Sequence, residues 1–368
     1  MAVTTIGVGD AKAVKRFSVF LATEHTTESY FDSRFVGVGE EAQTPIQQIT
    51  NLEKDQGDQI TYDLVMNLKQ QPTEGDSVIK GAEEQMAFFT DSLYIDQLRA
   101  GVNCGGKMTR KRTVHNLRKV ALSKKKPYWG RVKDELYFMY LSGARGVDTD
   151  WVFPTGYTGF AGNALSAPDT NHLVYGGTAT AKNNVTSSDK MSLATIDRTA
   201  TKAKVIGGGT AGVPAMVPCK IDGEERFVLV MHPFQEYDLR IATGTGGWLD
   251  VQKALATAIG KESPMFKGGL GVWNNVILHS HKSVVGFSDY GAGTNLPARR
   301  ALFMGRQAAV VAYGSPNSSE RFEWTEEMDD RGNQLVIVSG CIKGIKKTTF
   351  ANQDFGVIVI DTYAATSY

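Results

Sequence analysis

The chain has 368 residues, of which 42% are hydrophobic and 21% charged, and its formal net charge is +1. This length allows two or three domains with a buried core. The balanced charge argues against a dedicated nucleic-acid binder, which would carry a strong basic excess. The cysteines Cys104, Cys219 and Cys341 are far apart and form no CxxC pair. Neither a zinc site nor a disulfide framework is therefore indicated, and a reducing cytoplasm fits best.

The N-terminal segment, residues 1–45, is polar with scattered aromatic residues such as Phe31 and Phe35. It shows little periodicity, so we expect an arm that lies on another body. It also lacks the pattern of a signal peptide, and no apolar run in the chain approaches the ~18 residues of a membrane span. We therefore expect no membrane partner.

A long hairpin is predicted next. Five apolar residues from Ile60 to Leu68 alternate with mostly polar neighbours, which is typical of a strand. Residues 69–85 contain proline, glycines and four acids, which predicts a long polar loop, and residues 88–102 return as an extended apolar segment. Such a hairpin is too thin to form its own core and must lean on another body.

A basic helix follows the hairpin. Residues 107–133 contain eleven Lys or Arg and no Asp or Glu. Apolar residues at i, i+3 and i+4 spacing predict a helix with one buried stripe over residues 109–142. Pro127 interrupts this pattern, so either the helix bends there or two helices meet there, the second with Pro127 in its first turn.

The remaining chain predicts an α+β fold with mostly antiparallel strands. Residues 147–190 are rich in Gly, Asn, Thr and Ser and predict a long loop or insertion. An amphipathic helix is expected over 191–206 with Ser188 as its N-cap, and further helices after Pro233 and over 250–259. Strands are expected at 226–231, 272–279, 301–304, 308–313, 334–342 and 355–362, the last two joined by a basic loop.

No catalytic, cofactor or metal site stands out. Residues 101–107 have the GxxxxGK spacing of a phosphate-binding loop, but Met108 stands where Ser or Thr must reach magnesium. No apolar parallel strand precedes that segment, so a glycine hinge between hairpin and helix is favoured. His279 and His281 would share one face of a strand but have no evident third ligand. We therefore expect a protein that is not an enzyme and that has no cofactor.

Two adjacent segments carry opposite charge. Residues 40–99 contain twelve acids and four bases, which gives −8, whereas residues 107–133 carry +11. This pattern indicates that the hairpin of one copy lies on the basic helix of another copy. The residues that we expect at this contact are the acids Glu74, Asp76, Glu83 and Glu84 and the bases Arg110, Lys111, Arg112, Arg118 and Lys119.

The order of these parts resembles the major capsid proteins of tailed bacteriophages with the HK97-like fold, in particular the branch that includes phage N4. The resemblance covers essentially the whole chain. It rests on the motifs at residues 57–61, 94–97, 192–198 and 270–276, on the hairpin tip around Gly75, Asp76 and Gly81, and on a basic helix that starts near Arg112.

The resemblance implies an N-terminal arm at 1–45, an E-loop at 46–100 and a P-domain with a spine helix at 101–190, with an insertion near 147–190. It further implies an A-domain at 191–315 and P-domain strands at 316–368. The implied function is self-assembly into hexamers and pentamers of an icosahedral head, built in the host bacterial cytoplasm, around double-stranded DNA that is bound without sequence specificity. Implied partners are a portal at one vertex, scaffolding proteins and decoration proteins.

Two other functions compete with this one. The first is a nucleotide-binding protein built around Gly106 and Lys107, and the second is a nucleic-acid-binding module that uses the basic helix. Particle mass separates all three, because only a capsid subunit forms megadalton shells.

Overall fold

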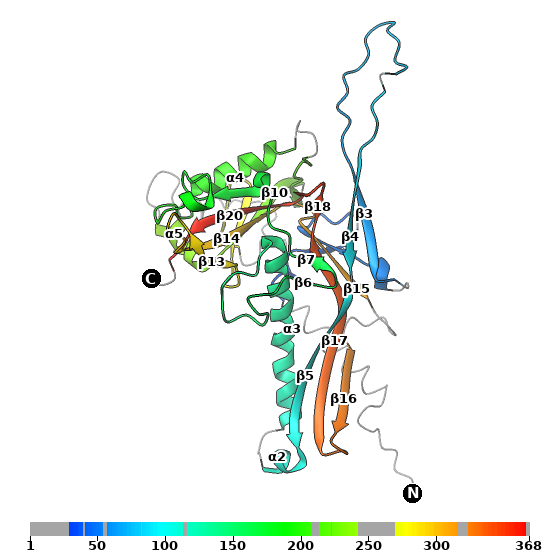
Figure 1. The fold of residues 1–368 in the computed structure, drawn as a ribbon, viewed down its shortest axis with the longest axis vertical. Coiled ribbons are helices and arrows are strands. Elements are labelled where there is room, and N and C mark those ends of the chain that lie inside the picture. The colour runs from blue at the N-terminus through cyan, green and yellow to red at the C-terminus, as the bar shows by residue number, and fades with distance from the viewer. Residues whose placement is uncertain are drawn as a thin grey trace.

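The fold comprises two β-sheets, a long helix between them and a projecting hairpin (Figure 1). The computed structural model describes residues 29–39, 41–53, 57–81, 83–112, 116–207, 213–221, 223–241, 269–314 and 323–365. The strand pairs are mostly antiparallel, as predicted. The parallel pairs are β1–β2, β2–β15, β10–β12 and β8–β20, whose bounds follow.

The six-stranded sheet lies beside the long helix. Its strands are β1 (Val36–Val38), β2 (Ile46–Ile49), β15 (Ala309–Gly314), β17 (Gln334–Lys347), β16 (Glu323–Asp329) and β5 (Asp96–Gly106). β17 is the central strand of the sheet, because it pairs with β15, β16 and β5.

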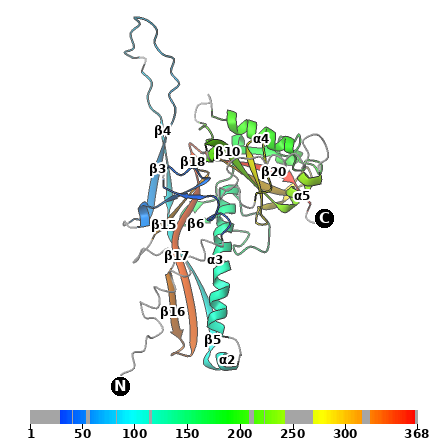
Figure 2. The same cartoon turned by 180° about the vertical axis from the view of Figure 1, so that it is seen from behind.

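The eight-stranded sheet forms the core of the other body, which Figure 2 shows from behind. Its strands are β8 (Leu173–Tyr175), β9 (Cys219–Ile221), β10 (Glu224–Met231), β11 (Gly271–Trp273), β12 (Val276–Ser280), β13 (Gly286–Tyr290), β14 (Leu296–Met304) and β20 (Val357–Tyr363). Strands β10, β14 and β20 are mostly buried, and each contains an apolar run of four or five residues, namely 227–231, 301–304 and 357–360.

Three strand pairs and the helices complete the fold. The remaining strands form three pairs: β3 (Gln59–Val65) with β4 (Phe88–Tyr94), β6 (Gly159–Phe160) with β7 (Asn163–Ala164), and β18 (Thr349–Phe350) with β19 (Gln353–Asp354). The helices are α2 (Lys107–Arg112), α3 (Leu117–Ser142), α4 (Leu193–Val205) and α5 (Pro233–Ile241), with 3₁₀ turns η1 (Asn51–Glu53), η2 (Thr170–His172) and η3 (Lys182–Asn184).

The long helix α3 passes through Pro127 without a break. Proline removes one backbone donor, which leaves the carbonyl of Ser123 without its helical partner. Both residues are exposed, so water can bond that carbonyl. The expected helix over 109–142 is nevertheless divided, because α2 ends at Arg112 and α3 begins after the N-cap Asn116, whose side chain accepts from the N–H of Lys119 at 3.2 Å.

The second half of α3 is buried on every side, not along one stripe. From Trp129 to Ser142 only Arg131 is exposed. Trp129 and Leu136 belong to the main core cluster, which also takes residues from β10, β14, β15, β17 and β20. This part of α3 therefore lies between the two sheets, and its charged residues must find partners inside the protein.

Several sequence predictions need correction in detail. The strand expected at 272–279 is two strands, β11 and β12, because Asn274 and Asn275 adopt positive φ and turn the chain. The N-cap of α4 is Ser192, not Ser188. The basic loop expected after residue 342 is the end of β17, where Lys343 and Lys347 are buried. The helix expected at 250–259 lies outside the described residues.

The sheets do not follow the domain boundaries that the resemblance implies. β15 lies in the segment assigned to the A-domain but pairs with β17 and β2 in the six-stranded sheet. β20 lies in the segment assigned to the P-domain strands but pairs with β14 and β8 in the eight-stranded sheet. The chain thus crosses between the two bodies more often than a linear division allows.

Candidate assembly interface

The hairpin tip carries the four predicted acids. Every described side chain of residues 67–85 is exposed, and the tip reaches far beyond both sheets (Figure 1). Glu84 accepts hydrogen bonds from the backbone N–H groups of Lys69, at 2.7 Å, and Gln70, at 2.8 Å, and Glu83 accepts from Gly81 at 2.6 Å. Two of the acids therefore also shape the tip, while all four present negative charge to the solvent.

Apolar side chains accompany the acids at the tip, and of these the sequence analysis singled out only Leu68. Leu68, Val78, Ile79 and Met86 are between 62% and 78% exposed. Val78 and Ile79 are one adjacent pair and Met86 stands apart from them, so these three give no periodic signal, whereas Leu68 ends the alternation that starts at Ile60. Single exposed apolar side chains are normal on protein surfaces, so only the adjacent pair Val78 and Ile79 points toward a surface that another molecule covers.

The predicted bases divide into two groups. Arg118 forms a bidentate pair with Glu326, with nitrogen–oxygen distances of 2.6 to 3.0 Å, and Arg110 donates to the backbone oxygen of Asn333 at 3.1 Å. These two are engaged within the chain. Lys111, Arg112 and Lys119 are exposed, so they retain positive charge for a partner.

Within one chain, the acidic tip and the basic helices lie at opposite ends. Figure 1 shows the hairpin tip at one end of the long axis and α2 at the other. Complementary charges separated by much more than a Debye length of ~10 Å do not attract each other appreciably. Any pairing between the two groups must therefore join different copies.

A groove of about 770 Å³ runs between β5 and the first half of α3. Its apolar lining includes Val102 and Val120, which are 37% and 42% exposed, and Tyr128. Arg99 and Lys124 also line it. An extended segment with apolar side chains and acidic flanks would match this groove chemically.

The phosphate-binding loop hypothesis is wrong. Residues 101–106 are part of β5 and pair with the antiparallel strand β17, for example Gly101 with Val338 and Val102 with Ile337. An extended strand cannot curl its N–H groups around a phosphate. The six-residue helix α2 begins only at Lys107, whose N–H donates to the side chain of Asn333 at 3.1 Å.

The histidine pair has a packing role. His279 is fully buried on β12, and the ring of His281 stacks on Phe138 with centroids 5.0 Å apart. Tyr30 packs against both histidine rings. Across the described ranges, no group of three or more His, Cys, Asp or Glu side chains could hold a metal ion, and no helix is long and apolar enough to cross a membrane.

The end of the N-terminal arm, residues 29–38, is fastened to α3 of the same chain. Phe31 and Phe35 are fully buried. Asp134 accepts from the hydroxyl of Ser29 at 2.7 Å and from the backbone N–H groups of Tyr30 and Phe31. The sequence predicted an arm that lies on another body, and residues 29–38 do lie on α3, where they are part of the core.

Replacing His281 by phenylalanine should make the fold less sensitive to acid. Burial, followed by the charges of Lys282 and Arg34, lowers the pKa of His281 to about 4. A lowered histidine pKa contributes stability that is present above the unfolded value of ~6.5 and is lost as pH falls toward 4. Phenylalanine keeps the stacking on Phe138 and has no proton to take up. As the pH falls from 7 to 4, the free energy of unfolding of the variant should rise by about 2–3 kcal/mol relative to that of the wild type.

The test compares the free energy of unfolding of the variant with that of the wild type at each pH. This comparison is needed because Asp134 stabilises the fold at low pH, whereas His281 destabilises it. Burial raises the pKa of Asp134 to about 6, against the hydrogen bonds from Tyr30, Ser29 and Phe31 that lower it. This carboxyl adds stability as pH falls through 6 in both proteins. Urea unfolding at each pH measures the difference, and a constant difference across this range would contradict the assignment to His281.

The sequence and the fold are both similar to those of phage capsid proteins. The sequence matches the family model described as phage capsid protein over residues 5–366. It is similar to the major capsid protein of Pseudomonas phage KPP25, with 26% identity over 356 residues that cover 87% of this chain and 88% of that protein. The fold is similar to the capsid of Ralstonia phage GP4, with a TM-score of 0.83, 49% identity and 100% of both chains covered. It is also similar to the cyanophage Pam1 capsid, with a TM-score of 0.70, 22% identity and coverage of 90% and 91%. The chain has the HK97-like fold and belongs to the phage capsid protein family.

Proposed function

We propose that the chain is the major structural subunit of an icosahedral phage head and that it self-assembles into closed shells. The observation that carries this proposal is the exposed hairpin tip, which places apolar and acidic side chains where its own chain cannot cover them. The full-length likeness to a solved phage capsid supports the same function. The chain expressed alone or with a scaffolding protein should form particles of megadalton mass, which negative-stain microscopy and sedimentation measure. A chain that stays monomeric in both settings would contradict the proposal.

The finer assignments remain part of this proposal. We propose the arm at 1–45, the E-loop at 46–100, the P-domain at 101–190 and 316–368, and the A-domain at 191–315, with β15 contributing to the six-stranded sheet and β20 to the eight-stranded sheet across these boundaries. Hexamers and pentamers form in the host cytoplasm, with a portal at one vertex and with scaffolding and decoration proteins as partners. The finished head of a tailed phage encloses double-stranded DNA, which it contacts without sequence specificity.

Within the shell, we assign the four tip acids to contacts with the basic helices of a neighbouring copy. Replacing Glu74 and the other three acids by Gln or Asn should reduce the yield of empty shells by about 3- to 150-fold. Each exposed ion pair contributes ~0.2–1 kcal/mol, so pairs with the three available bases contribute about 0.6–3 kcal/mol per subunit. The yield of closed particles in a gradient, at low and high salt, is the measurement, because salt screens these pairs.

The matched control removes four exposed acids elsewhere, namely Glu41, Asp150, Glu225 and Asp289. Shells of the control should form at the wild-type yield. An alternative is that the basic helices neutralise packaged DNA. Normal empty shells from the tip variant, with a defect that appears only on DNA filling, would favour that alternative and exclude pairing between copies.

A further inference from the structure

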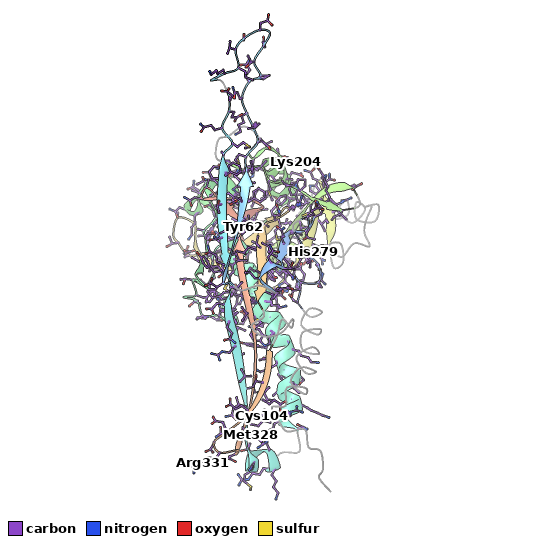
Figure 3. The ribbon with its side chains drawn as sticks, turned by 90° about the vertical axis from the view of Figure 1, so that its right-hand side faces the viewer. Tyr62, Cys104, Lys204, His279, Met328 and Arg331 are labelled. Carbon is purple, nitrogen blue, oxygen red and sulfur yellow. The ribbon has the colours of Figure 1, made fainter. Side chains whose placement is uncertain are left out.

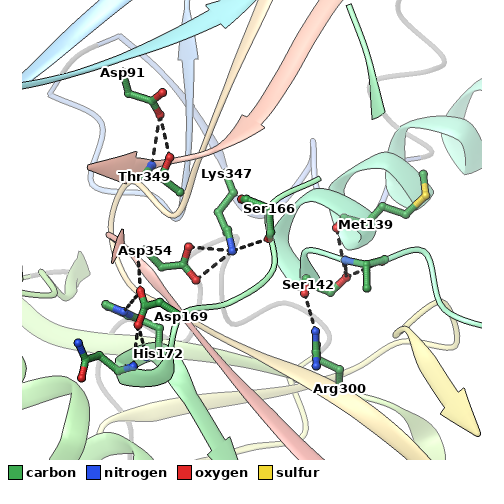
Figure 4. Close-up of polar contacts among 12 residues, drawn as sticks. Asp91, Met139, Ser142, Ser166, Asp169, His172, Arg300, Lys347, Thr349 and Asp354 are labelled. Atoms are coloured by element: carbon green, nitrogen blue, oxygen red, sulfur yellow. Dashed lines mark hydrogen bonds and ion pairs between the residues drawn. The ribbon is translucent and has the colours of Figure 1, made fainter. Parts of the chain in front are cut away.

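The root of the hairpin is held by polar contacts that converge on one carboxylate. Asp91 lies on β4 opposite Tyr62 of β3, and its side chain is only 9% exposed. The hydroxyl of Tyr62 donates to Asp91 Oδ2 at 2.9 Å. Lys346 Nζ of β17 donates to Asp91 Oδ1, and it also donates to the backbone oxygen of Ser92 at 3.0 Å. Thr349 of β18 adds contacts from its N–H and its hydroxyl at 3.3 and 3.4 Å, which Figure 4 shows.

Two partners of Asp91, Lys346 of β17 and Thr349 of β18, belong to the body of the chain, whereas Tyr62 belongs to the hairpin itself. Lys346 is fixed within the six-stranded sheet, where it pairs with Val310. The ring of Tyr62 stands edge-on to Phe350, with centroids 6.0 Å apart. Burial, with the negative charge of Asp91 as a second cause, raises the pKa of Tyr62, so its hydroxyl stays protonated and remains a donor. The carboxylate therefore ties the hairpin to β17 and β18 through directional bonds.

A second anchor lies three residues further along β4. The side-chain amide of Asn163 donates to the backbone oxygen of Tyr94 at 2.7 Å and accepts from its N–H at 3.0 Å. Asn163 is buried, and its own backbone oxygen accepts from Tyr140 of α3 at 2.8 Å. Gly344 allows the close approach at this point, because a Cβ there would lie 2.0 Å from the oxygen of Tyr94.

Two anchors determine a direction, whereas one anchor permits rotation. Asp91 and Tyr94 are three residues apart, which is ~10 Å along a strand. Beyond the end of the β3–β4 ladder, the described residues from 67 to 85 are all exposed, so nothing else in the described chain holds the projecting part. Leu93 of β4 is also buried beside Val310 and Ala312 of β15, but this apolar contact has no preferred direction. Without Asp91, the root would keep that contact and the clamp at Tyr94 and would lose the directional bonds to the Asp91 carboxylate from β17 and β18.

We propose that Asp91 is a positioning residue, which sets the direction in which the hairpin leaves the body and thereby the geometry of contact between neighbouring subunits. This inference rests on the proposed function for its effect on shells. A hydrogen bond to a charged group contributes enough free energy to change an equilibrium about tenfold or more. Loss of the Asp91 carboxylate should therefore reduce the population of correctly directed hairpins by at least about tenfold.

The test compares Asp91→Asn with Asp63→Asn, which removes an equal charge from an exposed position on β3 of the same hairpin. Cryo-electron microscopy of shells should show a wide spread of diameters and a weak or redirected hairpin for Asp91→Asn. Shells of Asp63→Asn should match the wild type. Wild-type diameters and an unchanged hairpin in Asp91→Asn shells would overturn the proposal.

A second measurement does not depend on assembly. Spin labels at Val65→Cys on the hairpin and Lys204→Cys on α4 report the distance between hairpin and body; Lys204 and Tyr62 are marked in Figure 3. The three native cysteines are buried, so labels attach to the introduced ones. The distance distribution should broaden in Asp91→Asn and stay narrow in Asp63→Asn. A merely stabilising role would lower the melting temperature without broadening this distribution, and that result would also overturn the proposal.

A wild type that forms no shells and a variant that does not fold can each be told apart from a failure of this proposal. If the wild type forms no shells, the proposed function fails, and the spin-label distances still decide the role of Asp91. If Asp91→Asn does not fold, Lys346→Met replaces it, because this variant removes the donor from β17 that binds Asp91. A narrow distribution in Lys346→Met, equal to the wild type, would then count against the proposal.

Discussion

Replacing Asp32 by alanine should lower the free energy of unfolding by about 3–5 kcal/mol. Asp32 accepts from Lys133 Nζ at 2.7 Å and from the hydroxyl of Tyr137 at 3.2 Å. The side chains of Asp32 and Lys133 are 6% and 1% exposed. The substitution would leave an ammonium group inside the protein beside α3 without its carboxylate, and this desolvated charge is the source of the expected loss. Urea unfolding of the subunit measures it.

The double variant Asp32→Ala, Lys133→Met is the control. Methionine fills much of the volume of lysine and carries no charge, so the double variant should recover most of the stability that the single variant loses. The recovery would show that the buried charge causes the loss. Equal destabilisation of the single and the double variant would instead attribute the loss to the missing contacts of Asp32 with Tyr137 and the arm.

Replacing Gly143 by alanine should lower the free energy of unfolding by about 3 kcal/mol or more. Gly143 ends α3 with φ +69°, and its N–H donates to Met139 at 2.9 Å. A Cβ at this position would lie 2.0 Å from the backbone oxygen of Ser166. Backbone cannot rotate away as a side chain can, so the end of the helix or the segment at Ser166 must move. Thermal unfolding measures the effect.

Gly332 separates the two causes of this loss. It also has positive φ, +83°, but a Cβ there would meet nothing within 4 Å. Gly332→Ala should therefore cost only the ~1 kcal/mol of an unfavourable backbone conformation. Similar losses for Gly143→Ala and Gly332→Ala would mean that the close approach to Ser166 contributes nothing.

The hairpin could be predicted from sequence because its signal is local. Ile60, Tyr62 and Leu64 alternate with exposed neighbours, and the strand β3 shows the same alternation in burial. The helix α4 was likewise predictable, since Ile196, Ala200 and Ala203 form its buried stripe. In both elements one face is apolar and the other polar, so burial follows from periodicity.

The buried charges could not be predicted in this way. Lys133, Asp134 and Glu135 follow one another in α3 and are all buried, although three successive charged residues normally indicate an exposed segment. Their partners include Asp32 and the backbone of Tyr30, more than a hundred residues away along the chain. Only the folded chain brings such groups together, so no local pattern records the pairing.

The candidate interface was predicted in part. The tip acids lie in the exposed loop where the sequence placed them, whereas Arg118 is engaged by Glu326, 208 residues away. The apolar residues Val78 and Ile79 were missed because one adjacent pair within a polar loop gives no periodic signal. Whether the acids meet the bases of another copy stays a prediction.

The proposed contact between the acidic tip of one copy and the basic α2 of another, which lie at opposite ends of one molecule, would have a consequence for the order of assembly. A contact between unlike surfaces is heterologous, so a dimer joined by it still has one unused tip and one unused basic end. Every added copy leaves the same two ends open, and only closure into a ring satisfies both. Incomplete rings therefore gain less free energy per subunit than closed ones, and the populations of dimers and trimers should stay small relative to free subunits and complete capsomers. Shells would then grow from whole rings, and each subunit would complete both of its contacts only when its ring closes.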